Sequence, residues 1–263
     1  MTYPVRHAYR SALVTGASSG IGASFTRLLA AAGCDLVLVA RRAGRLNELA
    51  ADLRKQHGVD VEVLPADLGS DDGLAAVVTR LTDGEPIELL VNNAARSARG
   101  SLAELAQETI DAQIRLNVVA LTRLARAAVT GMLARDYGGL LNVSSMASLT
   151  ASPGSSVYGA TKAYVTSLTE SLHAELAGTD VHVTALCPGF THTEFHATND
   201  VEIGYLPKIA WLDVDAVAQA GLDAVAVGRP LAIPGPQYKL AAGAVRVLPR
   251  SALRQLAHRF RRV

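Results

Sequence analysis

The sequence predicts an α/β fold in which helices cover both faces of a parallel sheet. Two observations lead to this prediction. Short apolar runs rich in strand-forming residues alternate with longer amphipathic stretches, from about residue 11 to about residue 233. In addition, no Gly/Ser-rich or charged linker interrupts this pattern, so residues 1–263 are predicted to form a single domain.

The apolar runs and the stretches between them give the expected elements. The expected strands, in chain order, are the runs "ALVTG", "DLVLVA", "VEVLPA", "IELLVNN", "LLNVSS", "VHVTAL" and "RPLAIPG". The amphipathic stretches predict helices over residues 21–32, 43–57, 71–81, 102–135 and 156–177. The sixth run, "VHVTAL", is followed by an irregular segment.

Composition and charge exclude several classes of protein. Residues 1–238 hold 18 basic and 24 acidic residues, and no basic patch is studded with aromatic residues, so we expect no binding of nucleic acid. The two cysteines lack the spacing of a disulfide framework or a zinc site, which fits a reducing cytoplasm. There is no signal-peptide pattern and no run of about 18 apolar residues. We therefore expect a cytoplasmic protein.

A glycine-rich turn joins the first strand to the first helix in "LVTGASSGIGASF". Glycines allow the backbone to turn sharply and to approach a pyrophosphate, and the N-terminus of the next helix attracts the anion. The alternative is a tight connection with no ligand. The candidate cofactor contacts in this turn are Gly16, Ser18, Ser19, Gly20, Ile21 and Gly22.

The end of the second strand indicates which dinucleotide binds. Ala40 stands where an NAD-selective protein usually presents an acid, and Arg41 and Arg42 follow it. Guanidinium groups suit a 2′-phosphate, so NADP(H) is the expected cofactor. Alternatively, these arginines only begin a solvated helix. After the third strand, Asp67 either binds the adenine amino group or caps the following turn, and Leu68 lies beside it.

Tyr158 and Lys162 lie four residues apart on a predicted helix, so they share one face. Ser145 ends the strand "LLNVSS" thirteen residues earlier, and Asn117 lies in the long preceding helix. With the glycine turn, "VNNAA" and "CPGFTHT", this set resembles the short-chain dehydrogenase/reductase family over nearly the whole chain. The resemblance implies a Rossmann-type doubly wound parallel sheet of about seven strands, and a homodimer or homotetramer.

The resemblance also implies a role for each of these residues. Tyr158 is the acid/base, Lys162 lowers its pKa and holds the nicotinamide ribose, Ser145 binds the carbonyl oxygen and Asn117 keeps a relay water. A free phenol, with a pKa of about 10, donates a proton slowly at neutral pH. Lowering that pKa to about 7 requires roughly 4 kcal/mol, which an ammonium group about 4 Å away nearly supplies. Ser144 is the alternative serine.

Further cofactor contacts follow from the same resemblance. They are Asn93 and Ala94 in "NNAA", where Ala95 replaces the usual glycine, and Pro188, Gly189, Thr191 and Thr193 in the later loop. His192 and His196 flank Glu194 but lack the H-E-x-x-H order, so no metal site is predicted.

The predicted substrate lid covers residues 190–212, where no periodicity holds and several apolar side chains occur. These side chains either cover an apolar or ketoacyl-type carbonyl substrate or pack on the core. The expected function is therefore an NADP(H)-dependent oxidoreductase that interconverts a ketone or aldehyde and an alcohol. The alternative is a non-catalytic NADP(H)-binding sensor or scaffold of the same fold.

The last segment, residues 239–263, holds seven basic residues and no acid. After Pro249, Ser251 is expected to cap a short helix with Leu253, Leu256, Phe260 and Val263 on one face. This basic extension either packs on a neighbouring subunit or the core, rests weakly on an anionic membrane, or docks an acidic carrier protein.

Overall fold

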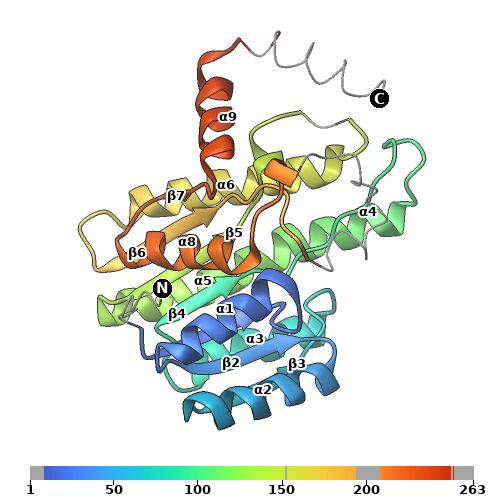
Figure 1. Ribbon diagram of the computed structural model, residues 1–263. Coiled ribbons are helices and arrows are strands. Elements are labelled where there is room, and N and C mark those ends of the chain that lie inside the picture. Colours follow the sequence, from blue (N-terminus) through green and yellow to red (C-terminus); the bar gives the residue numbers. More distant parts are fainter. Residues whose placement is uncertain (1–8, 152, 194–207, 250, 252–263) are drawn as a thin grey trace.

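A computed structural model describes residues 9–151, 153–193, 208–249 and 251 of the chain (Figure 1). Its centre is a seven-stranded sheet with the order β3-β2-β1-β4-β5-β6-β7, and every neighbouring pair is parallel. The strand order reverses between β1 and β4, which is where doubly wound sheets bind ligands. The strands are β1 Ser11–Thr15, β2 Asp35–Ala40, β3 Val61–Pro65, β4 Leu89–Asn92, β5 Gly138–Val143, β6 Val181–Leu186 and β7 Leu231–Ala232.

Helices pack on both faces of this sheet and form two apolar cores. One core joins β1 and β2 to α1, α2 and α8, with the side chain of Phe25 fully buried in it. The other joins the opposite face to α3, α5 and α6. These helices are α1 Gly20–Ala31, α2 Ala43–His57, α3 Asp71–Asp83, α5 Leu121–Arg135, α6 Ser156–Glu175 and α8 Val214–Ala226. The predicted Rossmann-type doubly wound sheet is confirmed.

The long helix predicted over residues 102–135 differs in detail. It begins at Gln107 as α4 (Gln107–Ile114), continues as the π-helical segment η1 (Arg115–Ala120), and ends as α5. By length and composition, 107–135 is the one helix of the described residues apolar enough to cross a membrane. However, α5 packs against α3, β4 and β5 in the core, as a helix of a globular protein does.

The chain after β6 departs furthest from the sequence prediction. There the structure adds the short 3₁₀ helix η3 (Lys208–Ala210), the helix α8, and a helix α9 (Pro236–Val247) that projects from the sheet beyond β7 (Figure 1). Another short 3₁₀ helix, η2 (Met146–Ser148), follows β5. The prediction began the basic extension at residue 239 and missed α9, which starts at a proline suited to a first helical turn. Most of the predicted lid, and nearly all of the helix predicted after Pro249, lie outside the described residues.

Candidate functional site

The glycine turn lies at the carboxyl end of β1 and is fastened to the turn after β4. The Thr15 hydroxyl accepts hydrogen bonds from the backbone N–H groups of Asn93 and Ala94, each at 3.0 Å. In return, the Asn93 side-chain amide donates to the Thr15 carbonyl oxygen at 2.9 Å and to the Gly16 carbonyl oxygen at 3.3 Å. Asn93, a predicted cofactor contact, therefore holds the glycine turn through its own hydrogen bonds. Its partner Thr15 was not among the residues predicted from the sequence.

The glycines of this turn are sterically required. Gly16 has φ +66°, and a Cβ there would lie 2.7 Å from the amide nitrogen of Asn93. A Cβ on Gly22 would lie 2.1 Å from the Gly16 carbonyl oxygen. Because no side chain fits, the backbone stays open at the N-terminus of α1, where unpaired N–H groups and the helix dipole attract an anion.

The two arginines after β2 reach the same end of the sheet. Arg42 precedes α2, and its Nη2 donates to the hydroxyl oxygens of Ser18 and Ser19, at 3.0 and 3.1 Å. Arg41 and Arg42 both line a pocket at this end of the sheet, and both are exposed. Arg42 therefore does more than begin a solvated helix, because it connects the β2 end with the glycine turn.

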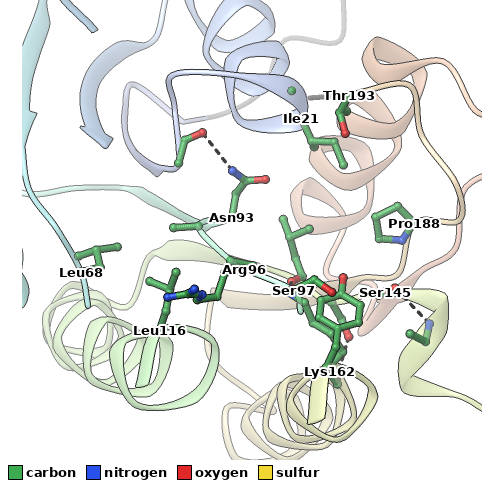
Figure 2. A pocket seen from close by; sticks show the side chains of 18 of the residues that line it. Ile21, Leu68, Asn93, Arg96, Ser97, Leu116, Ser145, Lys162, Pro188 and Thr193 are labelled. Atoms are coloured by element: carbon green, nitrogen blue, oxygen red, sulfur yellow. Dashed lines mark hydrogen bonds between the residues drawn. The ribbon is translucent and has the colours of Figure 1, made fainter. Parts of the chain in front are cut away.

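Asp67 and Leu68 line the pocket after β3. The Asp67 carboxylate accepts a hydrogen bond from the Gly69 N–H at 2.9 Å, so it caps the local turn. Ser70, not Asp67, caps α3 itself, because its hydroxyl accepts from the Gly73 N–H. Leu68 faces Leu116 across one end of the pocket (Figure 2).

Tyr158 and Lys162 project from α6 into this pocket beside Ser145 (Figure 2 labels Ser145 and Lys162). Lys162 is buried, its Nζ donates to the Val143 carbonyl oxygen at 2.7 Å, and it lies 5.8 Å from the centre of the Tyr158 ring. The side chains of Ser145 and Tyr158 form a hydrogen bond. The structure thus brings the three residues together at the end of β5.

The pKa of Tyr158 lies above its usual value of 10 in this structure, and the lowering effect of Lys162 stays a prediction. Burial raises the pKa of Tyr158 to about 12, the hydrogen bond with Ser145 opposes this rise, and nearby Cys187 adds to it. Burial also lowers the pKa of Lys162 to about 8, against the small opposing effect of Cys187. Removal from water is thus the largest influence on both pKa values, because it penalises the charged form of each group.

Ser144 and Ser145, the two candidate serines, point to different places. The Ser144 hydroxyl is buried and bonds the Lys162 carbonyl oxygen at 2.9 Å and the Thr166 hydroxyl at 2.7 Å. Ser145 begins η2, where its hydroxyl accepts from the Ala147 N–H at 3.1 Å. Ser144 therefore joins β5 to α6, whereas the Ser145 hydroxyl stays next to Tyr158.

Asn117 is buried in η1 and does not line the pocket. Its amide group accepts from the Arg96 N–H at 3.0 Å and donates to the Arg96 carbonyl oxygen at 2.9 Å. The same nitrogen donates to the Thr161 hydroxyl at 3.1 Å. Asn117 therefore ties the loop after β4 to α6, three residues from Tyr158.

The loop after β6 forms the opposite wall. The predicted contact residues Pro188, Gly189, Thr191 and Thr193 all line the pocket. Thr193 lies across from Gly20: a Cβ added to Gly20 would be 3.2 Å from the Cβ of Thr193. Thr191, in contrast, is buried and donates its hydroxyl to the Gly189 carbonyl oxygen. His192 stacks on Trp211, with ring centres 4.3 Å apart.

The glycine turn, Arg41, Arg42, Asp67, Ser145, Tyr158, Lys162 and the loop after β6 border one cavity of about 1680 Å³, larger than the volume of about 300–1,000 Å³ typical of small-molecule sites. Sequence reasoning missed several of its lining residues, namely Arg96, Ser97, Thr150, Tyr238, Ala241 and Val245. These residues come from loops and from α9, where no motif marks them. Among the described residues, no group of three or more His, Cys, Asp or Glu side chains is placed to hold a metal ion.

Comparisons with known proteins agree with this geometry. The family model described as short chain dehydrogenase matches residues 10–202. The 7beta-hydroxysteroid dehydrogenase of Collinsella aerofaciens is 34% identical over 181 residues, 69% of this chain and 68% of the relative. The very-long-chain 3-oxoacyl-CoA reductase of Anas platyrhynchos is 32% identical over 188 residues, 70% of this chain and 60% of the relative.

A solved structure extends the similarity to the whole fold. The short-chain dehydrogenase from Sphingobium yanoikuyae, in complex with NADPH, superposes with a TM-score of 0.83 at 38% identity, covering 90% of this chain and 93% of its own. The match therefore includes both the glycine turn and the Tyr158 helix. The family match and the shared sequence and fold place this chain in the short-chain dehydrogenase/reductase family.

Proposed function

We propose that this protein is an NADP(H)-dependent oxidoreductase that reduces a bulky, apolar ketone to an alcohol. The observation that carries the proposal is the meeting of two sites in one cavity. The glycine turn and Arg41 and Arg42 lie at one end, and Ser145, Tyr158 and Lys162 lie at the other. A binding module would need only the first of these.

The residues present fit an NADP(H) molecule. The backbone at Gly16 and Gly22 leaves no room for a side chain, as close approach of a pyrophosphate requires. Two guanidinium groups follow β2, and neither Ala40 nor its neighbours offers the carboxylate that would hold a free ribose hydroxyl. The NADPH in the structure of the Sphingobium yanoikuyae dehydrogenase supports the same choice.

Each residue at the catalytic end has a proposed task. Bound NADPH supplies the hydride that the carbonyl carbon accepts. The Ser145 hydroxyl donates a hydrogen bond to the carbonyl oxygen, and the Tyr158 hydroxyl transfers its proton to that oxygen, which yields the alcohol. Lys162, held by the Val143 carbonyl oxygen, stabilises the phenolate that remains.

The raised pKa of Tyr158 suits the reductive direction. With a pKa of about 12, the phenol is fully protonated at neutral pH and is ready to donate. Proton donation becomes easier when a positive charge develops next to the phenol. Asn117 is proposed to act as a positioning residue through Thr161 and Arg96, and the relay water that the family resemblance assigns to it stays a prediction.

The substrate end favours an apolar molecule. Beyond Ser145 and Tyr158, the cavity is lined by Met146, Ala147, Pro153, Phe190 and Val245. The names of the two relatives, a hydroxysteroid dehydrogenase and a very-long-chain oxoacyl-CoA reductase, support a large lipid-like carbonyl compound as the substrate of this chain.

A homo-oligomer is proposed as the working form. Leu133 on α5 and Tyr164 on α6 are large apolar or aromatic side chains outside the cavity lining, and each is at least 40% exposed. Covering them would remove apolar surface from water. Light scattering of the full chain gives the number of subunits.

A panel of carbonyl compounds tests the function. It should contain oxosteroids, 3-oxoacyl thioesters and small ketones, each with NADPH and with NADH, followed by the loss of reduced-nicotinamide absorbance. We expect turnover of at least one bulky ketone with NADPH and much slower turnover with NADH. Tight binding of NADPH with no turnover on the whole panel would favour the sensor or scaffold instead.

A further inference from the structure

The hydroxyl group of Tyr238, the third residue of α9, joins two segments that lie far apart in sequence. It accepts a hydrogen bond from the Phe190 N–H at 3.0 Å and donates one to the Ala210 carbonyl oxygen at 2.6 Å. Phe190 belongs to the loop after β6, and Ala210 ends η3. One side chain thus holds both described ends of the segment predicted to cover the substrate.

The ring of Tyr238 packs directly on Gly189. A Cβ at position 189 would lie 2.0 to 2.4 Å from three carbon atoms of that ring, so only glycine permits this contact. Further hydrogen bonds strengthen the same junction: the Leu212 N–H donates to the Phe190 carbonyl oxygen at 2.8 Å, and the Gln237 side chain donates to the Ile209 carbonyl oxygen at 3.0 Å.

Tyr238 also begins the face of α9 that borders the cavity. Ala241 and Val245 follow it three and seven residues later, so the three side chains share one face of the helix, and all three line the cavity. This face of α9 therefore forms one wall of the cavity. The distance of that wall from Ser145 and Tyr158 depends on how α9 is attached to the rest of the fold. At its N-terminal end that attachment is made by Tyr238 and Gln237.

We propose that Tyr238 is a positioning residue that sets the width of the substrate end by fixing α9 to the loop after β6. This inference rests on the proposed function and extends it to specificity: α9 forms the wall against which a bulky apolar substrate lies, and Tyr238 holds that wall. The proposed cofactor contacts after β1, β2, β3 and β4 do not touch Tyr238. Gly189 does touch it, but through the ring, which a phenylalanine would keep.

The first test is Tyr238→Phe, which removes the hydroxyl and keeps the ring. We expect the KM for a bulky ketone to rise about tenfold, because a backbone N–H and a carbonyl lose their partner. The kcat and the affinity for NADPH should change by less than about threefold. Tyr164→Phe is the control, since its hydroxyl also makes one hydrogen bond, to Thr122, but does not line the cavity. Equal KM values for wild type and Tyr238→Phe would overturn the proposal.

Hydrogen exchange of the cofactor-free protein gives a second measurement that needs no substrate. In Tyr238→Phe, the Phe190 amide loses its acceptor, so we expect peptides that cover residues 186–193 and 208–213 to exchange faster, while those from β1 and β5 stay unchanged. Faster exchange everywhere would show general destabilisation and would also overturn the proposal. If wild type turns over no carbonyl compound, the proposed function fails, yet this measurement still reports on Tyr238 as the residue that holds α9.

The wall itself is tested by Ala241→Phe. The added ring narrows the cavity, so we expect the KM for bulky ketones to rise at least fivefold while the KM for small ketones changes little. Leu240→Phe, at an exposed neighbouring position that does not line the cavity, is the control. Equal effects of Ala241→Phe on large and small substrates would show that α9 does not face the substrate.

Discussion

The cofactor end and the substrate end of the cavity are built differently. At the cofactor end, Thr15, Gly16, Asn93 and Ala94 connect two neighbouring strand ends by four hydrogen bonds that involve the backbone. At the substrate end, α9 is attached to the loop after β6 and to η3 mainly through Tyr238 and Gln237. The proposed cofactor site is thus held mainly by hydrogen bonds that involve the backbone. The α9 wall of the proposed substrate site is held in place by a few side chains.

Tyr158 lies where the two ends meet, and its replacement is expected to have the largest effect. Tyr158→Phe removes the proton donor and little binding surface, so turnover should fall by about 10² to 10⁴, with NADPH affinity unchanged. Tyr164→Phe, six residues further along α6, is the matched control. A Tyr158→Phe enzyme that kept more than about a tenth of the wild-type rate would contradict the acid/base role.

The cofactor end is tested by Arg41→Ala. Loss of hydrogen bonds to a charged phosphate is expected to weaken NADPH binding by roughly 1.5 to 3 kcal/mol, about 10- to 150-fold. NADH kinetics should barely change. Arg42→Ala is an informative comparison, because Arg42 also bonds Ser18 and Ser19. Titration of both nucleotides by fluorescence provides the measurement, and equal losses for NADPH and NADH in Arg41→Ala would show that this residue supports the fold instead.

Burial of the Lys162 ammonium group is expected to lower the free energy of unfolding of the protein. Its pKa falls from 10.5 to about 8 on folding, so below pH 8 the folded state carries the full penalty of a buried charge, and the penalty disappears as pH rises towards 10.5. The net penalty is about 3 kcal/mol. Replacing Lys162 would also leave the Val143 carbonyl oxygen without its donor, at a cost of about 1 kcal/mol.

Lys162→Met should therefore be inactive yet more stable than wild type at pH 7, by about 1 to 2 kcal/mol. Urea unfolding of the cofactor-free proteins at pH 7, 8, 9 and 10 checks this: the advantage should be nearly constant up to about pH 8 and shrink from there to pH 10. A variant less stable than wild type at pH 7 would show that Lys162 stabilises the fold.

The smallest expected effect concerns Gln113 in α4, which does not line the cavity. This α4 side chain is fully buried, and neither of its amide atoms has a hydrogen-bond partner among the residues that the structure describes. Gln113→Met should raise the free energy of unfolding by about 1 kcal/mol, and Tm by about 2 to 4 °C. Gln107→Met is the control, because that amide is exposed and bonds Asp111. A lower Tm for Gln113→Met would indicate that a buried water satisfies the amide.

The sequence predicted the core of the fold because each core element carries a local signal. The alternation of apolar runs and amphipathic stretches located the strands, and α2 matches its predicted range, 43–57. The glycine turn was also predicted from the sequence. Its φ angles and close contacts require glycine at these positions, so the turn leaves a recognisable pattern of residues. The contact that holds it, Thr15 with Asn93 and Ala94, spans more than 75 residues and leaves no local pattern.

The substrate end could not be derived in the same way. The contribution of Tyr238 depends on three segments meeting in space, and a tyrosine near the start of a short amphipathic helix has no distinctive spacing. The pKa of Tyr158 was missed for a related reason. The spacing of Tyr158 and Lys162 reveals their proximity but not the loss of water around both groups, which is the largest influence on both pKa values.

The π-helical segment η1 restricts how this protein can vary in length. A π-turn holds one more residue than an α-turn, so the helix from 107 to 135 carries the equivalent of a single-residue insertion beside Asn117. Deleting one residue from Arg115–Ala120 would leave a regular α-helix of good composition, but Asn117 would no longer stand in the wide turn that aims its amide group. The Arg96 backbone would then lose its partner. A change that improves the helix would thus disconnect the loop after β4 from α6.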